Sequence, residues 1–433
     1  MNKEKRSFLI ATITIFVLMI LTYVLTLVLD CNGISILKFV FSPILVLGSD
    51  SGITTIAICI FLLIIGGISN CLNKCGFIEY MLNKTVSKYG KQRYKLLFVV
   101  IFFFMALGAL IGSFEEVVPI VPIVVTLMLN LGFDKMVGIS ISLLAVGCGF
   151  ASGLFNPFNI GVAQGIAGLP LFSGVSLRLI SFIMIYFLLS ICVYVYAKKA
   201  DISYELESRN NYVYDEIKEK ALKSFIIIFS IGILLVLISS ILTFLQDYTI
   251  IIIALTFLIS GILATIKMNV SKNDRLTYFK EGALDIAPSI ILILMAASIK
   301  YIMDESGAIN TIVKFLIDMA SGMNSVELIL FIYLICLFLE VFVPSGSAKA
   351  FLLMPLVLPV AAKFNISSQL VILAYAFGDG FSNVFYPTNP ALIICLGLVN
   401  VDYKDWFNHS WKFQLLNLIL TSGILLLGLA INY

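Results

Sequence analysis

The sequence has little of what metal enzymes, nucleotide-driven machines and soluble surfaces need. It contains one histidine, His409, which excludes a metal site built on several histidines. Charged residues make up 12% of its 433 positions, against about 25% in soluble domains. The eight cysteines are scattered through apolar runs, a pattern that favours small buried side chains over a disulfide framework. A Gly-x-x-x-x-Gly-Lys-Ser/Thr loop is also missing, which argues against direct use of ATP.

What the sequence has instead is apolar length, because 61% of its residues are hydrophobic. This composition predicts an all-α polytopic membrane protein, since a helix satisfies its own backbone hydrogen bonds in lipid. The first apolar segment, residues 8–29, is longer than a signal-peptide core and lacks a small-residue cleavage site, so we expect a retained helix. We expect a multi-pass protein of the plasma membrane, surrounded by the lipid bilayer and without a nucleic-acid partner.

The basic residues predict the orientation of the chain. Lys3, Lys5 and Arg6 precede the first apolar segment, which predicts a cytoplasmic N-terminus by the positive-inside rule. The polar stretch 198–223 predicts a cytoplasmic linker near the middle of the chain. Counting crossings from these anchors gives the two halves opposite orientations in the membrane.

Two stretches depart from the pattern of ordinary spanning helices. Residues 96–131 form an apolar run with a polar centre and a second arm of about 12 residues, while a span needs about 20. We therefore predict a re-entrant hairpin there, and a second at 328–363. Each hairpin precedes an apolar segment that is interrupted by an Asn-Pro pair, which predicts broken transmembrane helices at 136–169 and 368–398.

The two stretches match each other in register. Pairs of identical residues recur at a spacing of about 233 residues, as in transporters built from inverted repeats: Pro122 with Pro355, Gly147 with Gly380, and Asn156-Pro157 with Asn389-Pro390. Gly76 and Gly307 recur at nearly the same distance. We predict a first inverted repeat at 1–200, a linker and connecting helix at 201–247, and a second repeat at 248–433. Chance matching in a chain rich in glycine and proline is the alternative.

The centre of the first hairpin carries Ser113, Glu115 and Glu116. A carboxylate at bilayer depth costs about 2.5–3.5 kcal/mol on insertion scales, and two adjacent carboxylates repel each other. We expect Glu115 to bind a coupling ion or an amino group of the substrate. For Glu116, a ligand role and a capping-box role with Ser113 both stay open.

The tip of the second hairpin, Ser345-Gly346-Ser347, begins a half-helix. Its free amides and positive dipole end suit a substrate carboxylate, although a plain N-cap explains Ser345 equally well. Lys349, one turn further along, is either a counter-charge for the substrate or an ion-pair partner of Glu340 or Asp379. We favour the ion pair.

Polar side chains also flank the two predicted breaks. Asn156, Asn159, Thr388 and Asn389 are capping residues by type, yet at a break in the membrane they become candidate ligands. We expect no cofactor beyond a coupling ion, which is either Na⁺ or H⁺.

A second pair of candidates lies on the helix that leads into the second break. Asp379 and Asn383 are four residues apart, on one helix face, and could bind a cation together. A Na⁺ site is expected near Asn156, Asp379, Asn383 and Asn389.

The chain resembles the YfcC branch of the DcuC-like C4-dicarboxylate carriers, in the ion transporter superfamily. The resemblance is carried by Asn-Pro-Phe at 156–158, Ala-Gln-Gly-Ile-Ala-Gly-Leu-Pro at 163–170, Pro-Ser-Gly-Ser at 344–347 and Phe-Gly-Asp-Gly-Phe-Ser-Asn at 377–383. It implies a scaffold domain plus a transport domain, opposed hairpins, a homodimer and elevator-type alternating access. Lys349 and Asn389-Pro390 depart from the residues usual in the branch.

These observations predict a secondary active transporter of small carboxylate-bearing metabolites, such as C4-dicarboxylates or amino acids, that is ion-coupled or an exchanger. A basic amino acid antiporter of the arginine/ornithine type is the alternative, since Glu115 and Glu116 suit a cationic group better than a dianion. A channel is a remote alternative. An intramembrane aspartyl protease needs a second membrane aspartate beside Asp379, and the sequence has none in a convincing place, so we expect no enzyme.

Overall fold

The computed structural model describes residues 3–29, 33–49, 52–89, 92–112, 114, 117–170, 172–200, 213–241, 248–320 and 322–433. Over these ranges the chain forms helices and turns and contains no strand, which confirms the all-α prediction. Six of the described helices are long and apolar enough to cross a membrane. Their spans are Thr55–Lys74, Arg93–Leu110, Lys135–Ser152, Val175–Lys199, Gly346–Lys363 and Tyr403–Ala430.

The first half of the chain contains a hairpin and then a helix that is interrupted. Its elements in order are α1 (Lys3–Val28), α2 (Ile36–Leu45), α3 (Gly52–Lys74), α4 (Phe77–Tyr89), α5 (Arg93–Ile111), α6 (Val121–Asn130), α7 (Lys135–Ile139), α8 (Ala145–Ser152), α9 (Val162–Ile166) and α10 (Val175–Lys199). A π-helical turn, Ser140–Leu144, joins α7 to α8, and a second, Pro157–Gly161, leads from the break into α9.

The second half also contains a hairpin followed by an interrupted helix. They are α11 (Glu216–Ile241), α12 (Thr249–Lys267), α13 (Lys272–Ser306), α14 (Ala308–Ala320), α15 (Ser325–Leu339), α16 (Gly346–Lys363), α17 (Ser368–Ser382), α18 (Pro390–Leu398) and α19 (Tyr403–Ala430). Helix α17 stops at Ser382 and α18 begins at Pro390, as predicted for a broken helix.

Local chemistry explains where several of these helices begin. The Asp134 side chain accepts a hydrogen bond from the Val137 amide (2.9 Å), and this cap starts α7. Asn324 and Glu327 form a capping box at the start of α15. Asn389 accepts a bond from the Leu392 amide (3.3 Å), and Pro390 supplies the first residue of α18. Short-range signals therefore fix both the starts of helices and the site of the second break.

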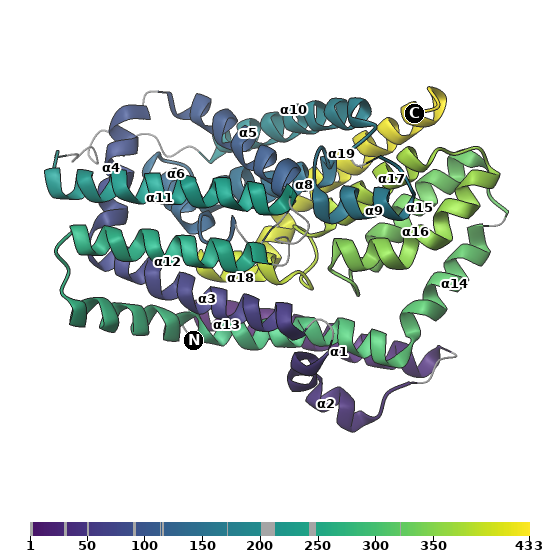
Figure 1. Ribbon diagram of the computed structural model, residues 1–433, viewed down its shortest axis with the longest axis horizontal. Helices are drawn as coiled ribbons and strands as arrows, with labels where there is room; N and C mark the ends of the chain where they lie inside the picture. Colours follow the sequence, from purple (N-terminus) through teal and green to yellow (C-terminus); the bar gives the residue numbers. More distant parts are fainter. Residues whose placement is uncertain are drawn as a thin grey trace.

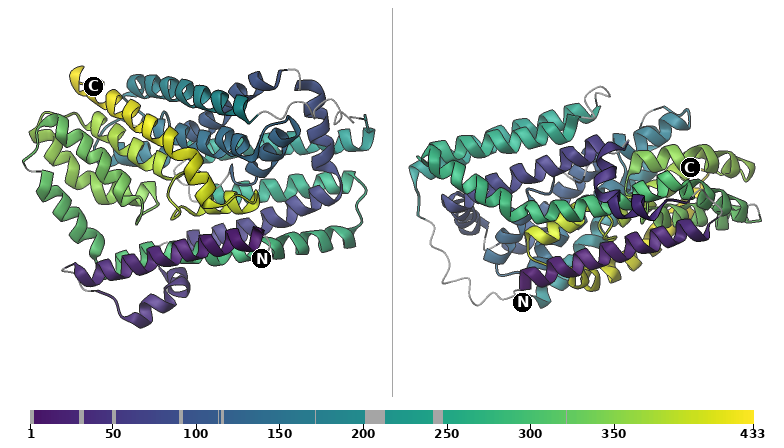
Figure 2. Two further views of the ribbon diagram at one scale, coloured as in Figure 1. Left: turned by 180° about the vertical axis from the view of Figure 1, so that it is seen from behind. Right: turned by 90° about the horizontal axis from the view of Figure 1, so that it is seen from below.

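The helices pack into two groups. In one, α13 lies against α1, α2 and α3, and α12 lies against α3 and α11. Figure 1 shows α3, α12 and α13 side by side along one edge of the molecule, with α10 and α19 at the opposite edge. Both views in Figure 2 show α1 running alongside α13. The second group contains the hairpins and the broken helices.

Contacts within the second group recur between the two halves. Helix α5 of the first hairpin packs on α8, and α15 of the second packs on α17. The broken helices α8 and α17 also cross each other, and α16 of one half lies against α9 of the other, as α6 lies against α18. The tips and breaks of both halves therefore meet in the centre of this group.

A pair of glycines marks the same recurrence. Gly76 and Gly307 both have positive φ angles, 73° and 71°, and each directly precedes a helix of 13 residues, α4 or α14. Both helices connect the two groups, since α4 contacts α3 and α6 while α14 contacts α13 and α15. These matches agree with the predicted repeat. The opposed orientation of the two halves in a membrane stays a prediction.

The two hairpins differ in length. Helix α6 has 10 residues and therefore reaches about 15 Å, half of the roughly 30 Å hydrocarbon core. Helix α16 has 18 residues and qualifies by length as a span. The re-entrant course of residues 96–131 and 328–363 stays a prediction.

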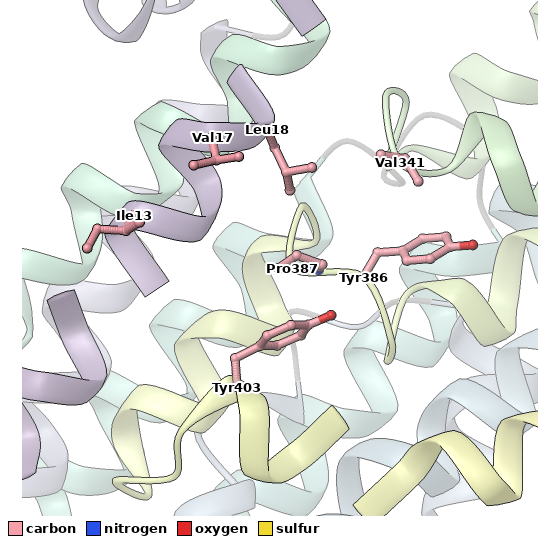
Figure 3. Close-up of a pocket in the computed structure, with 7 residues that line it drawn as sticks. All are labelled: Ile13, Val17, Leu18, Val341, Tyr386, Pro387 and Tyr403. Carbon is pink, nitrogen blue, oxygen red and sulfur yellow. The ribbon is translucent and has the colours of Figure 1, made fainter. Parts of the chain in front are cut away.

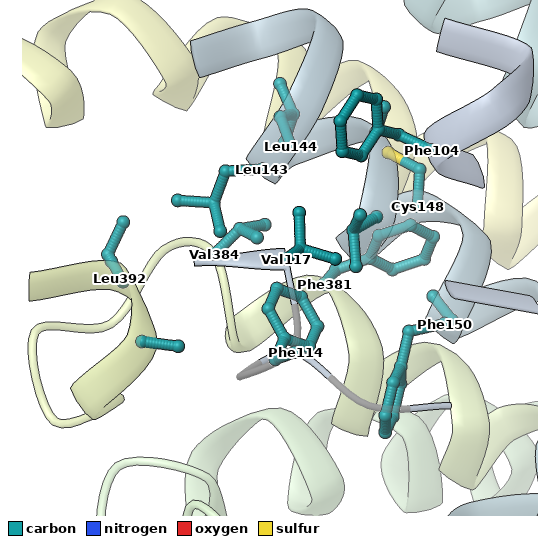
Figure 4. Packing of buried hydrophobic residues seen from close by; sticks show 14 of the residues in the cluster. Phe104, Phe114, Val117, Leu143, Leu144, Cys148, Phe150, Phe381, Val384 and Leu392 are labelled. Atoms are coloured by element: carbon teal, nitrogen blue, oxygen red, sulfur yellow. The ribbon is translucent and has the colours of Figure 1, made fainter. Parts of the chain in front are cut away.

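Close packing at the centre depends on small residues. A Cβ atom added to Gly380 would lie 2.3 Å from the Cα atom of Ala151, so glycine is what allows α17 to cross α8. Around this crossing, Figure 4 shows Phe114, Phe150, Phe381 and Val384 packed together with side chains from both halves.

Candidate functional site

The first break is held by buried asparagines. Asn156 and Asn159 are both fully buried, and the backbone N–H of Asn159 donates a hydrogen bond to Oδ1 of Asn156 (3.2 Å). A Cβ atom on Gly112, the last described residue before the first hairpin tip, would lie 1.9 Å from the same oxygen. Gly112 has a positive φ of 70°. The backbone before the tip therefore rests directly on the amide of the break.

The second break is closed by its own amides. Asn383 donates to the backbone carbonyl of Asp379 (2.8 Å), and its Oδ1 accepts a bond from Asn389 (2.6 Å). The Thr388 hydroxyl is buried and has no hydrogen-bond partner among the described residues. The side chain of Asn383 thus serves the backbone, and joint binding of a cation with the Asp379 carboxylate stays a prediction.

Three charged side chains meet between the second hairpin and α17, and we call them the ionic triad: Glu340, Lys349 and Asp379. The Lys349 ammonium contacts Oε2 of Glu340 and lies 3.0 Å from Oδ1 of Asp379. All three residues are fully buried. Pairing of Lys349 is therefore confirmed, and it involves both carboxylates.

The ionic triad carries a formal net charge of −1, since two carboxylates face one ammonium. A buried charge is expensive, so such a site favours a further positive charge. Asn159 of the first break lies within 3.5 Å of Oδ2 of Asp379, measured from Nδ2. The charges of the second half thus meet an amide of the first.

The second tip approaches the ionic triad closely. A Cβ atom on Gly346 would lie 2.7 Å from Oδ2 of Asp379, and the Tyr375 hydroxyl donates a hydrogen bond to the Gly346 carbonyl. Ser345 is the N-cap residue of α16, but its side chain makes no capping bond. Ser345 and Ser347 are both half-buried. The first amides of α16 are therefore not taken up by the Ser345 hydroxyl.

Ser113, Glu115 and Glu116 lie outside the described residues. Of their neighbours, Phe114 is buried and its ring packs against Phe150 of α8, with ring centroids 5.6 Å apart. The roles expected of these two glutamates and of Ser113 stay predictions.

Sequence reasoning assigned Glu340 no role beyond a candidate partner for Lys349. It is the C-cap residue of α15 and the only carboxylate in a long apolar run, 328–348. Isolation of this kind is the signal that could have identified it, since a lone carboxylate among apolar residues needs a partner. Tyr375, whose hydroxyl bonds to the Gly346 carbonyl at the second tip, had no feature in the sequence that indicated this contact.

A second buried cation lies apart from the ionic triad. The Nη2 atom of Arg178 donates to the carbonyls of Phe172 (2.9 Å) and Ser173 (2.6 Å), in the turn before α10. Near it, Gln164 donates to Ser173 (2.8 Å) and to Gln369 (3.1 Å). These bonds tie the end of the first broken helix to the start of α17.

An apolar pocket of about 430 Å³ opens beside the second break. Figure 3 shows the residues that line it, which come from α1, the turn after Glu340, the second break and the start of α19: Ile13, Val17, Leu18, Val341, Tyr386, Pro387 and Tyr403. None of these side chains is charged, so the pocket has a different chemistry from the ionic triad.

The predicted Na⁺ site depends on which oxygen atoms near the two breaks are available as ligands. The described residues contain no group of three or more His, Cys, Asp or Glu side chains placed to hold a metal ion. The Oδ1 atoms of Asn156, Asn383 and Asn389 each accept a hydrogen bond. A Na⁺ ion at these residues would compete with bonds that hold the two breaks together.

A family model described as "C4-dicarboxylate anaerobic carrier" (DcuC) matches residues 10–430. Among curated proteins, "Putative basic amino acid antiporter YfcC" of Escherichia coli K12 is 28% identical over 380 residues, covering 83% of this chain and 74% of that protein. An "Uncharacterized protein" of Haemophilus influenzae is 25% identical over 400 residues, covering 88% and 77%.

Two solved structures also align with the chain. The Alcanivorax borkumensis YdaH transporter gives a TM-score of 0.47 at 16% identity, covering 99% of both chains. Neisseria gonorrhoeae MtrF, described among antimetabolite efflux pumps, gives 0.45 at 14% identity, covering 96% and 94%. Because both TM-scores are below 0.5, the family assignment rests on the sequence comparisons.

Proposed function

The chain belongs to the DcuC family of C4-dicarboxylate anaerobic carriers, and from this premise we propose that it exchanges basic amino acids across the membrane. It is a multi-pass membrane transporter and not an enzyme. The proposed substrate is a small molecule with a net charge of +1, such as arginine or ornithine.

The net charge of the ionic triad carries this proposal. A substrate of charge +1 neutralises the formal −1 of Glu340, Lys349 and Asp379, whereas a dicarboxylate would raise the local charge to −3. Each uncompensated charge at bilayer depth costs about 2.5–3.5 kcal/mol on insertion scales. The name of the Escherichia coli relative agrees with a cationic substrate.

The same place suits the other end of an amino acid. The first turn of α16 offers backbone amides and a positive dipole end to a carboxylate, and Ser345 does not cap them. A basic amino acid has both groups, a carboxylate for the Gly346 turn and a cationic side chain for the triad. We assign Ser345, Gly346 and Ser347 to the carboxylate, and Asp379 with Asn159 to the cation.

Movement between the two sides would follow the packing of the molecule. The hairpins and broken helices form one packed group, and α4 and α14 connect it to the group around α3 and α13. This division supports a transport domain that moves against a scaffold in an elevator, within two inverted repeats. A homodimer in the plasma membrane, with a cytoplasmic N-terminus, completes the proposed arrangement.

Exchange of C4-dicarboxylates is the second candidate, and the description of the family favours it. The ammonium of Lys349 would then serve the substrate, which requires it to leave Glu340 or Asp379. A channel is the remote alternative.

Binding and counterflow together test the function. The purified protein is screened by thermal shift against arginine, ornithine, succinate, fumarate and a neutral amino acid, and counterflow is then measured in proteoliposomes. We expect stabilisation and saturable exchange with arginine and ornithine only. Stabilisation by dicarboxylates alone would overturn the proposal, and uncoupled ohmic current would indicate a channel.

A further inference from the structure

We propose that Glu340 carries a proton that leaves when the cationic substrate binds, so that the protein exchanges one substrate cation for one proton. This inference rests on the proposed function and names the coupling ion of the same site. It is drawn from the geometry of the ionic triad.

The two carboxylates differ in their partners. Asp379 faces the Lys349 ammonium with one oxygen, while Asn159 and Gly346 approach the other. Glu340 faces Lys349 with Oε2, and its Oε1 is buried without any hydrogen-bond partner among the described residues. An unpartnered carboxylate oxygen in the interior is costly, and a proton removes that cost. Glu340 is therefore the better acceptor.

Helix position points to the same residue. Glu340 is the C-cap of α15, where unpaired carbonyl groups concentrate partial negative charge. A carboxylate at a helix C-terminus is destabilised, whereas a carboxylic acid can donate a hydrogen bond. Asp379 lies in the last turn of α17 and feels the same effect, but its Oδ2 has Asn159 beside it, whereas Oε1 of Glu340 has no partner among the described residues.

The groups around Glu340 leave one cation to neutralise two anions. Helix α15 contributes Cys336, α16 contributes Lys349, and α17 contributes Tyr375 and Asp379. Tyr333 of α15 interacts with Cys336, and its hydroxyl bonds to Thr421. The tyrosines and the cysteine are uncharged near neutral pH by type. Lys349 therefore balances one of the two carboxylates, and the remaining negative charge is neutralised by a proton on Glu340 or by the substrate cation.

Two loaded states then share the same charge. With Glu340 protonated, the ionic triad is neutral and can cross the membrane without substrate. When a substrate cation arrives, the Glu340 carboxylic acid releases its proton to water on the open side, and the carboxylate together with Lys349 and Asp379 is again neutralised. With neither a proton nor a substrate cation bound, the ionic triad has a formal charge of −1, and moving this charge across the membrane is unfavourable.

Proton release can be measured directly. Arginine is added to the purified full-length protein in weakly buffered detergent solution containing a pH indicator, and affinity is measured separately between pH 5 and pH 8. We expect about one proton released per arginine bound. At the acidic end of this range, binding should become about tenfold tighter for each unit by which pH rises.

The Glu340→Gln variant mimics the protonated state. We expect it to bind arginine more weakly than the wild type, to release no proton, and to have an affinity independent of pH. Glu281→Gln, which makes the same change at an exposed carboxylate on α13, is the control and keeps the wild-type pH dependence. Thermal melting without ligand reports whether the Glu340→Gln variant is folded.

The outcomes separate this inference from the proposed function. If the wild type binds no basic amino acid, the proposed function fails. If it binds arginine with an affinity that does not change with pH, or that changes with Na⁺ concentration at fixed pH, proton coupling is overturned and the proposed function stands. If the Glu340→Gln variant still releases a proton, another residue carries the proton and the assignment to Glu340 is overturned.

Membrane potential gives a second measurement. Because one positive charge enters for each that leaves, arginine uptake driven by a pH gradient should be unchanged when a potassium diffusion potential is imposed on the proteoliposomes. A several-fold response to the potential would contradict a one-for-one exchange of like charges.

Discussion

The two halves of the molecule share an architecture but not a chemistry. In the first half, the described polar groups at the break are the side-chain amides of Asn156 and Asn159, and both bond to the backbone. In the second half, Glu340, Lys349 and Asp379 bring three charges to the matching place. Similar helix contacts thus surround both breaks, while the second half supplies the three charges of the ionic triad.

The difference shows that two halves with similar helix contacts can carry different polar groups. Neutral amides satisfy a broken helix at modest cost, because each forms short local hydrogen bonds. A charged group in the interior instead requires an opposite charge. Binding specificity is therefore expected to depend on the second half, and helix geometry on both.

The largest expected effect is on folding when Lys349 is lost. Lys349→Met leaves two fully buried carboxylates facing each other, and breaking a buried ion pair costs about 3–5 kcal/mol. We expect a sharp drop in melting temperature or in the yield of folded protein. The triple variant Lys349→Met, Glu340→Gln, Asp379→Asn should recover folding without activity. A wild-type melting temperature for Lys349→Met would mean that the triad is not formed.

Substrate binding should distinguish the two halves next. Asp379→Asn removes a buried charge that we assign to the substrate cation, and its loss should weaken arginine binding by about 2–5 kcal/mol. Asn156→Ala at the first break should weaken binding by about 1 kcal/mol, as expected for one neutral hydrogen bond. Calorimetry on both purified variants measures the comparison. Equal losses would remove the proposed asymmetry.

The two hairpin tips allow a smaller comparison. Gly112→Ala places a Cβ in left-handed backbone, which costs about 1–2 kcal/mol, and directs it at Asn156. Gly346→Ala meets Oδ2 of Asp379 without that backbone strain, so it should lower the melting temperature less and affect binding more. Gly397→Ala is the control, because Gly397 is a residue of α18 at which an added Cβ atom has no neighbour within 4 Å. A lower melting temperature for Gly346→Ala would reverse the expected order.

The smallest effect is expected at a charge cluster outside the membrane spans. The hydrogen bond from Lys84 lowers the pKa of Glu219, with a further contribution from Tyr80. Because the folded-state pKa is lowered, the stabilisation is present above the unfolded-state pKa and is lost as pH falls through the folded-state pKa. Lys84→Met should cost less than about 1 kcal/mol, in contrast to Lys349→Met. Melting temperatures of the wild type and the variant should differ at pH 7 and converge as pH falls below the folded-state pKa of Glu219.

Much of the fold follows from local sequence. The apolar lengths predict the helices, and Asn-Pro at 156–157 and 389–390 marks both breaks because each pair combines a capping side chain with a fixed φ angle. The recurrence of Gly76 and Gly307 corresponds to two left-handed residues before α4 and α14. The π-helical turn at Ser140–Leu144 has no comparable signal in the sequence.

The candidate site was only partly predictable. The ion pair of Lys349 with a carboxylate was expected, because a lysine in an apolar run needs a partner. The choice between Glu340 and Asp379 was left open, and the structure uses both. Asn383 was grouped with the Asp379 carboxylate by helical spacing, yet its amide bonds to the Asp379 backbone. Spacing along a helix identifies a shared face but not the direction of a side chain.

The sequence by itself determined where helices start, where they break and which buried positions are charged, because capping, proline geometry and hydrophobic length act over a few residues. Only the tertiary structure decided that one ammonium lies between two carboxylates and that an amide of the other half reaches one of them. Those contacts depend on how closely α16 and α8 approach α17. Gly346 permits the first approach and Gly380 the second, and no short-range pattern encodes either.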